Sequence, residues 1–186
     1  MRRRGRRFAR RGTGSGRRAG HIGCLRRRRG VRGVEAAREA ASWPLGFLRF
    51  EELAEVAEIE ARVFPEPLDL PSLARLWLTP GTVYLAIRDG ERLAAYFSFQ
   101  VQGPTAHVIA NATRPEYQGR GLGHRILREA EPVARSRGAR WFLGEVRRSN
   151  LRQLAVLREL GWVEVGRCPR FFGNGEEAVV VWRCLP

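Results

Sequence analysis

The order of apolar patterns along the 186-residue chain predicts an α+β fold built on a mixed, mostly antiparallel sheet with helices on its faces. An Asp-Gly pair at residues 89–90 separates two apolar runs rich in β-branched and aromatic residues, which is typical of a β-hairpin. Strand-like, helix-like and strand-like patterns follow one another over residues 106–146. Such a unit requires a parallel pair of strands, so the sheet must contain both kinds of pairing.

Two helices are expected before the first strand. Leu53, Val56 and Ile59 recur with helical spacing in residues 47–64, and glutamates crowd the first turns, where carboxylates favour a helix N-terminus. A cluster of three prolines ends this helix. Pro71, the last of them, is placed to open a short second helix.

The remaining elements follow from changes of period and from breaker residues. A helical face begins at Leu122 and ends near residues 136–138, with Pro132 inside it, where a proline should kink the helix or leave a carbonyl unpaired. Further strands are expected at residues 106–113, 139–146, 162–167 and 177–185, and a helix at 150–160.

Net charge divides the chain into two parts. Residues 1–34 contain 14 Arg and no acidic residue, whereas the other 20 Arg and all 19 Asp and Glu lie in residues 35–186, which leaves that part at 20 − 19 = +1. The sequence Ser-Trp-Pro-Leu-Gly at residues 42–46 marks the change of composition. We therefore expect an Arg-rich, disordered extension over residues 1–46 and one folded domain over residues 47–186.

The Arg-rich extension has two interpretations. A basic arm binds RNA, the ribosome or another acidic surface through phosphate and carboxylate groups. A solvated extension, or translation from a misplaced start, explains the same charge without function, and all 34 basic residues are Arg, which codon bias alone can produce. The second interpretation is favoured, because a charge run is a weak signal by itself.

The cysteine, histidine and apolar contents limit the classes of protein to which the chain can belong. Cys24, Cys168 and Cys184 show no CxxC spacing, and three scattered histidines suggest no metal cluster, so neither a disulfide framework nor a metal site is expected. No apolar run approaches the roughly 20 residues of a membrane span. A cytoplasmic protein without a membrane anchor is the expectation.

A glycine-rich stretch joins the expected strand at 106–113 to the helix that begins at Leu122. It reads Gln-Gly-Arg-Gly-Leu-Gly over residues 118–123. A strand that runs through such a turn into a helix gathers free backbone N–H groups at the positive helix end, where a phosphate binds. No Gly-Lys-Ser/Thr follows, and GxGxxG spacing is absent, so nucleotide-binding loops of those two types are excluded.

Residues 118–123 resemble the Q/R-x-x-G-x-G/A pyrophosphate signature of the GCN5-related N-acetyltransferases (GNAT). The lead-in Arg-Pro-Glu-Tyr at 114–117 is similar to that of the family, and so are Ser149-Asn150 before a helix and Leu-Gly-Trp after it at 160–162. Some of this likeness is to the members that acetylate alanine at ribosomal-protein N-termini. The resemblance covers about residues 47–186 and implies the GNAT fold, in which the two parallel strands splay apart.

The resemblance also implies acetyl-CoA as the donor. Backbone amides of the glycine turn would hold the pyrophosphate, the end of the preceding strand would pair with the pantetheine arm, and Asn150 would bond the cofactor or simply cap its helix. The residues so implied are Asn111, Ala112, Thr113, Gln118, Gly119, Arg120, Gly121, Leu122, Gly123, His124 and Asn150. Glycine is expected there because a Cβ would obstruct close approach of the backbone to the phosphates.

Acetyl transfer to an amine requires a base, and Glu145 is the candidate. The position that it matches carries the proposed base in members that acetylate ribosomal-protein N-termini. An ion pair with Arg147 on the same strand face is an equally favoured interpretation of Glu145. His107 is a second candidate base, although a histidine without a catalytic role is the more common case.

The sequence departs from the family at the expected proton donor. Leu157 stands where a tyrosine is usual, and Phe171-Phe172 replace a Tyr-Tyr pair. Water, Ser149, Tyr84, Tyr96 or a group of the bound substrate remain as proton donors, or the thiolate leaves unprotonated. The acceptor is either a small amine or a protein N-terminus. Two further possibilities also stay open: contact with RNA or the ribosome through residues 1–34, and formation of a homodimer.

Overall fold

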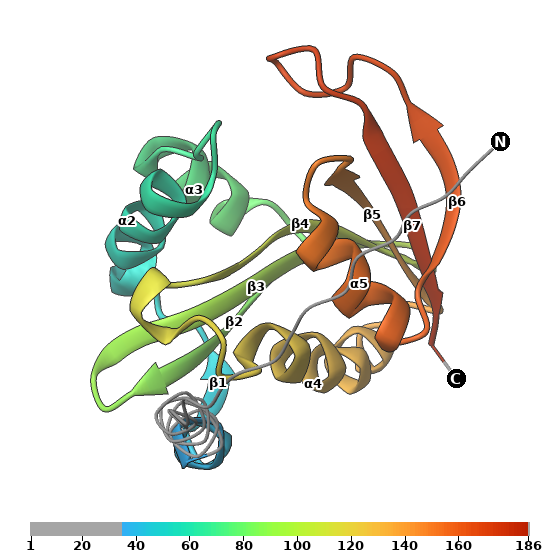
Figure 1. Ribbon diagram of the computed structural model, residues 1–186. Coiled ribbons are helices and arrows are strands. Elements are labelled where there is room, and N and C mark those ends of the chain that lie inside the picture. The colour runs from blue at the N-terminus through green and yellow to red at the C-terminus, as the bar shows by residue number, and fades with distance from the viewer. Residues whose placement is uncertain (1–34, 186) are drawn as a thin grey trace, which may run out of the picture.

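The computed structural model describes residues 35–185, and a seven-stranded sheet runs through them in the order β1-β2-β3-β4-β5-β7-β6 (Figure 1). The strands are β1 (Leu45–Phe47), β2 (Thr82–Asp89), β3 (Arg92–Gln102), β4 (Thr105–Thr113), β5 (Trp141–Arg147), β6 (Val163–Cys168) and β7 (Ala178–Cys184). The helices are α2 (Leu53–Val63), α3 (Leu70–Leu78), α4 (Leu122–Ser136) and α5 (Leu151–Glu159), with a helical stretch at 35–41 and 3-10 turns η1 (Phe50–Glu52) and η2 (Pro115–Tyr117).

The β4–β5 pair makes the sheet mixed, as the sequence predicts. These strands pair in parallel, whereas the other neighbouring strands of the described sheet pair antiparallel. Only three residues of β4, Thr105 to His107, pair with β5, although β4 continues to Thr113 and β5 to Arg147. The two strands therefore diverge beyond His107, which confirms the expected splay.

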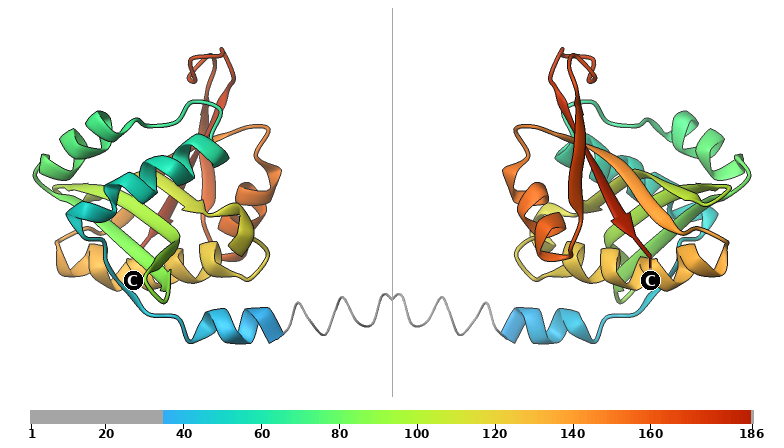
Figure 2. Two further views of the ribbon diagram at one scale, coloured as in Figure 1. Left: turned by 90° about the vertical axis from the view of Figure 1, so that its left-hand side faces the viewer. Right: turned by 90° about the vertical axis from the view of Figure 1, so that its right-hand side faces the viewer.

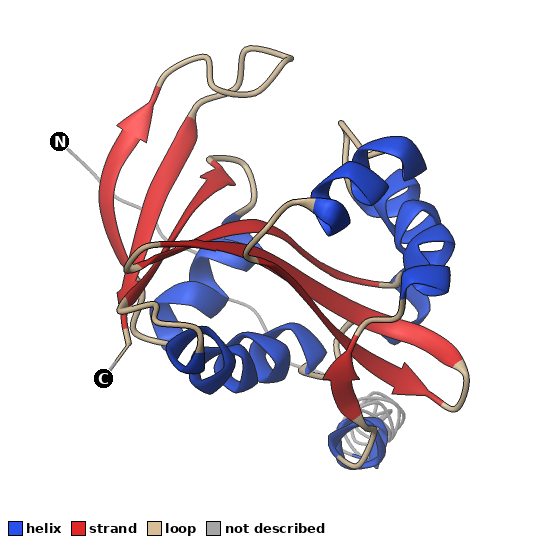
Figure 3. Ribbon diagram, turned by 180° about the vertical axis from the view of Figure 1, so that it is seen from behind, coloured by secondary structure: helices blue, strands red, loops and turns tan. Residues whose placement is uncertain are grey.

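Helices cover both faces of the sheet (Figure 3). On β2, Val83 and Leu85 face a core that contains side chains of α4 and α5, while Tyr84 and Ala86 face a second core with α2 and α3. Alternation places successive side chains of a strand on opposite faces. Because both faces are covered, β2 and β3 read in the sequence as nearly continuous apolar runs.

The predicted bounds of α4 are confirmed, and Pro132 lies inside the helix, as predicted. The helix begins at Leu122, continues through Pro132 and ends at Ser136, so the proline does not divide the element. Its buried side chains, which include Ile126, Leu127 and Ala130, lie at helical spacing and pack into the core beneath the sheet. The expected hairpin is also present, since Gly90 has φ 59° in the turn between β2 and β3.

The packed body begins earlier than the boundary expected after residue 46. Ala40 is fully buried, Trp43 is 7% exposed, and β1 pairs antiparallel with β2 at Leu45↔Ile87. The prediction missed these contacts because a three-residue strand and a single tryptophan carry little periodic signal. The Arg-rich part over residues 1–34 lies outside the described residues.

Candidate active site

The divergence of β4 and β5 creates the candidate active site. Ser98 of β3 faces Ala110, and the next residue, Phe99, faces Val108, so Ile109 bulges out of β4 just beyond the paired section. Beside it, a Cβ on Gly144 of β5 would lie 3.1 Å from Val108 Cβ, a contact tighter than ordinary packing. Glycine there lets the strands approach before they part, and a small cavity lies at this point.

The glycine turn presents a row of free N–H groups. Across residues 119–124 the backbone N–H groups find no acceptor in the described structure, and the first bond of α4 runs from Arg125 N to Gly121 O at 3.0 Å. Gly119 and Gly121 have φ of 81° and 79°, which side chains disfavour. Space around both is open, so the left-handed backbone, rather than crowding within the protein, requires glycine here. Such a nest suits a pyrophosphate.

The other residues predicted for the donor lie around this turn. From Asn111 to Thr113, β4 pairs with β3 on one edge, and no strand of the described sheet occupies the opposite edge. That edge is available to an added strand-like ligand. Gln118 Nε2 donates to Thr113 O at 3.2 Å, which folds the turn back on β4. Asn150 caps α5, since its Oδ1 accepts from Gln153 N at 3.1 Å.

Glu145 meets His107 rather than Arg147. Phe142 and Ala106 face the α4–α5 core, so alternation puts Glu145 of β5 and His107 of β4 on the opposite face, beside α2 and α3. Their Oε2 and Nε2 atoms are 2.8 Å apart, with the Glu145 side chain 18% exposed and that of His107 48% exposed. The hydrogen bond that Glu145 accepts from the imidazole raises the pKa of His107, and partial burial opposes the rise.

Arg147 has other partners, and together they form a clasp across this face. Its Nη2 lies 3.2 Å from Glu66 Oε2, in the connection between α2 and α3, and Nη1 lies 3.1 Å from Glu176 Oε2 beyond β6. Glu66 also accepts from the backbone N–H groups of Gly173 and Asn174, at 3.1 and 3.0 Å. The bond from Gly173 and the other donors lower the pKa of Glu66. The clasp of Glu66, Arg147, Gly173 and Asn174 ties two distant loops together.

The two tyrosine hydroxyls considered as proton donors lie away from open space, whereas Ser149 is exposed in the turn before α5. Tyr96 is fully buried and donates to the Glu60 carboxylate, while the Tyr84 hydroxyl is buried with no partner in the described residues. Burial and the charge of Glu60 raise the pKa of Tyr84 to about 12. Leu157 is 3% exposed and lines the small cavity, so α5 offers a hydrocarbon surface where a hydroxyl is usual.

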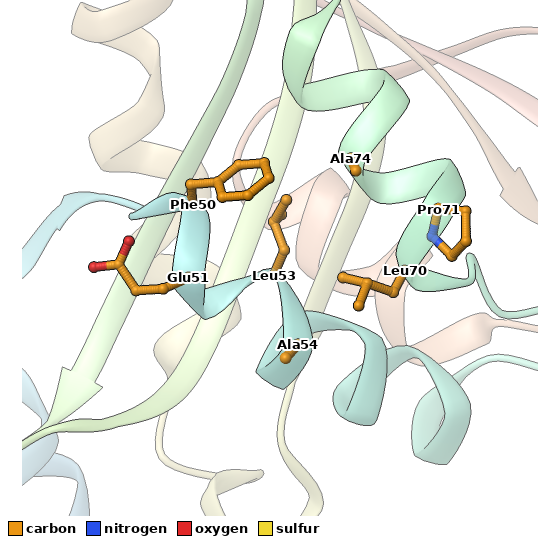
Figure 4. Close-up of a pocket in the computed structure, with 7 residues that line it drawn as sticks. All are labelled: Phe50, Glu51, Leu53, Ala54, Leu70, Pro71 and Ala74. Atoms are coloured by element: carbon orange, nitrogen blue, oxygen red, sulfur yellow. The ribbon is translucent and has the colours of Figure 1, made fainter.

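A second depression lies outside this region. It is an apolar groove between the start of α2 and α3, and Glu51 is the only charged residue among those that line it (Figure 4). The lining residues are Phe50, Glu51, Leu53, Ala54, Leu70, Pro71 and Ala74. One exposed carboxylate without a partner base or acid gives this groove no catalytic set.

Residues 35–185 contain neither a cluster of metal ligands nor a membrane-spanning helix. Within that range no three His, Cys, Asp or Glu side chains gather as a metal site. None of the helices in the same range has the length and apolar content that a membrane crossing needs.

The fold and the glycine turn are typical of the class of acyl-CoA-dependent transferases. Within that class, the chain belongs to the acetyltransferase (GNAT) family, whose model matches residues 50–162. It is an N-acetyltransferase, and acetyl-CoA is its acetyl donor.

Known proteins similar to the chain agree with this assignment. N-alpha-acetyltransferase RimI of Mycobacterium tuberculosis is 33% identical over 148 residues, which cover 75% of this chain and 90% of the relative. The solved ribosomal-protein-S18-alanine N-acetyltransferase of Escherichia coli has a TM-score of 0.70 at 23% identity over 76% of this chain and 93% of its own. YncA of Salmonella typhimurium, solved with acetyl-CoA, has a TM-score of 0.66 at 18% identity over 78% and 95%. At these identities, the two structures establish the fold alone.

Proposed function

We propose that this chain transfers the acetyl group of acetyl-CoA to the α-amino group of a protein N-terminus. The observation that carries the chemistry is the Glu145–His107 pair at the divergence of β4 and β5. The similarity to a relative named an N-alpha-acetyltransferase favours a protein N-terminus over a small amine as the acceptor.

In this proposal, the donor lies along the free edge of β4. Backbone N–H groups of residues 119–124 hold its pyrophosphate, and residues 111–113 pair with its pantetheine arm. When bound, acetyl-CoA supplies a thioester carbonyl with a good thiolate leaving group. Asn150 is committed to capping α5 through its side-chain oxygen, so its amide NH₂ is the part that remains for the donor.

The acceptor arrives as an ammonium ion and must lose a proton before it attacks. Glu145 Oε2 lies 2.8 Å from His107 Nε2, and the pair can take up a proton when the imidazole is neutral. Because the hydrogen bond with Glu145 raises the pKa of His107, its imidazole becomes neutral at a higher pH than an ordinary histidine does. A carboxylate alone would be a weaker base, so His107 matches the base to neutral pH.

The leaving thiolate finds no hydroxyl on α5, since Leu157 lines the cavity. The Tyr96 hydroxyl donates to Glu60, and the Tyr84 hydroxyl is buried. We propose that the protonated Glu145–His107 pair returns its proton to the sulfur or to water, which needs no further side chain.

The donor assignment is tested by isothermal titration with acetyl-CoA. Wild-type protein should bind, and Gly121→Asp should bind far more weakly, because φ of 79° strains the new residue and its carboxylate repels phosphate. Gly138→Asp is the matched control, since φ of 91° imposes similar strain at the far end of α4. Equal affinities for wild type and Gly121→Asp would overturn the placement of the donor.

The acceptor assignment is tested by a screen of amines. N-terminal peptides, including ones that begin with alanine, are compared with the same peptides blocked at the α-amine and with small primary amines. Thiol release with the free peptides alone supports the proposal. Turnover of small amines, with peptides inert, would replace the protein acceptor and leave the donor assignment intact.

A further inference from the structure

The polypeptide upstream of the family match packs against the glycine turn. The family model begins at residue 50, but Ala40 and Trp43 are buried before it. Arg125, in the first turn of α4, donates from Nη1 to the carbonyls of Ala40 at 3.1 Å and Trp43 at 2.8 Å. The helical stretch at 35–41, drawn in blue, accordingly lies next to α4 (Figure 2).

An aromatic pair holds the one charged side chain within the glycine turn. Trp43 and Tyr117 meet edge to face, with ring centroids 5.2 Å apart at 87°. The Arg120 guanidinium carbon lies 5.5 Å from the Trp43 ring and 5.3 Å from the Tyr117 ring. Arg120 lies between Gly119 and Gly121, which both have positive φ. Trp43, Tyr117 and Arg120 are called the aromatic clamp below.

The N–H donors of Arg120 remain free in this clamp. No carboxylate or carbonyl among the described residues accepts a bond from Arg120, whereas Arg114 and Arg125 nearby donate to such groups. Cation–π attraction fixes the charge without using hydrogen-bond donors. A planar guanidinium with free N–H groups beside a row of free backbone N–H groups is suited to a phosphate oxygen.

We infer that the aromatic clamp positions Arg120 to bind a phosphate of the donor, so that Trp43, outside the family match, is a positioning residue of the donor site. The inference rests on acetyl-CoA being the donor. It adds a side-chain contact to a turn that otherwise binds through its backbone. It also gives the segment at residues 40–47 a role beyond filling the core.

Titration calorimetry with acetyl-CoA measures this role directly. Arg120→Met should raise Kd about tenfold to a hundredfold, the usual range for a hydrogen bond between charged groups. Trp43→Leu should raise Kd about threefold to tenfold, because Arg120 remains but is no longer held. Arg128→Met removes the same charge from an exposed position of α4 and should leave Kd unchanged.

Two further variants separate positioning from folding. Trp43→Phe retains a ring and should restore most of the affinity, at a thermal unfolding midpoint close to that of Trp43→Leu. In the double variant with Arg120→Met, Trp43→Leu should cause no further loss, since the group that it positions is gone. Additive losses would instead assign Trp43 a general structural role and overturn the inference.

The phosphate itself is identified with 3′-dephospho-CoA. If Arg120→Met weakens CoA and its dephospho form equally, Arg120 contacts the pyrophosphate, and if the loss disappears with the dephospho form, it contacts the 3′-phosphate. An unchanged Kd for both ligands, with wild-type binding intact, overturns the role of Arg120 alone. Absence of binding by wild type would overturn the donor assignment and this inference together.

Discussion

At the scale of single residues, the candidate base depends on a neighbour that lies 38 positions away. Glu145 and His107 occupy adjacent strands, and the parallel register brings their side chains to one face. The family resemblance implies Glu145 as the base, and an ion pair with Arg147 is the equally favoured alternative from the sequence. His107 was considered separately as a base, and only the register joins the two.

Removal of the carboxylate should abolish most of the rate. Glu145→Gln keeps a similar shape but cannot take a proton, so kcat should fall about 10²–10⁴-fold, the usual contribution of a general base. Donor affinity, measured by calorimetry, should stay unchanged, because Glu145 lies on the face opposite α4. A variant with wild-type kcat would remove Glu145 from the mechanism.

Removal of the imidazole should shift the pH dependence. With His107→Gln, the acidic limb of kcat/KM should move toward the ordinary carboxylate range, since the remaining base is a carboxylate without its partner.

The raised pKa of His107 also predicts a stability effect: the ion pair stabilises the fold below the ordinary histidine pKa, and this contribution is lost as pH rises through the folded value. Unfolding midpoints of both proteins at pH 6 and pH 9 measure it, and an unmoved kcat/KM limb contradicts the pairing.

The buried carboxylate of Glu52 predicts how the stability of the fold depends on acidic pH. Burial would raise the pKa of Glu52, but bonds from Arg88 and Arg49 outweigh it and hold the pKa at about 2. The depressed value stabilises the fold above the ordinary carboxyl pKa and is lost as pH falls toward 2, a change of about 3 kcal/mol. Urea unfolding from pH 5 to 2 should therefore be steeper in pH for wild type than for Glu52→Gln. Glu91→Gln, at a 95% exposed side chain, should follow wild type.

At the scale of elements, two loops that come from opposite ends of the sheet meet through the clasp. Successive side chains on one strand face lie about 7 Å apart, so Arg147 stands one step above Glu145. The clasp therefore borders the approach to Glu145 from the side of α2 and α3. No local pattern predicts it, because Glu66 and Gly173 are 107 residues apart.

Breaking the clasp should alter acceptor binding more than stability. With Glu66→Ala, the KM for an N-terminal peptide should change several-fold while the Kd for acetyl-CoA stays constant, and stability should change by less than about 1 kcal/mol, as for exposed ion pairs. Hydrogen exchange at Gly173 and Asn174 should accelerate, since their acceptor is lost. Glu116→Ala is the control, because the Glu116 side chain is 42% exposed, as that of Glu66 is, and its pair with Arg62 lies elsewhere. Unchanged exchange and KM would mean that the clasp does not border the acceptor path.

At the scale of the whole molecule, charge and catalysis are separable. The formal charge of +15 falls to +1 without residues 1–34, because these carry 14 Arg. A deletion of residues 1–34 should leave thiol release from acetyl-CoA unchanged, since the described site lies entirely within residues 35–185. Filter binding at several salt concentrations measures whether residues 1–34 contribute to RNA affinity. A loss of thiol release on deletion would place part of the site in the arm.

The fold was predictable to a large extent. The hairpin at Gly90, the parallel unit through α4 and the last two strands have clear local signals, and each is present. The start of the packed body was not predictable. Leu45 to Phe47 form too short a strand to show alternation, and Trp43 becomes a core residue only because α4 and Tyr117 lie against it.

The sequence by itself determined the glycine turn and the elements on either side of it. The glycines at 119 and 121, the helix that follows and the strand before them are local features, since they depend on backbone freedom and side-chain period within a few residues. Only the tertiary structure decided the partners: His107 for Glu145, Glu66 for Arg147 and Trp43 for Arg120. These contacts span tens of residues, and strand register and sheet order, rather than neighbouring residues, bring them together.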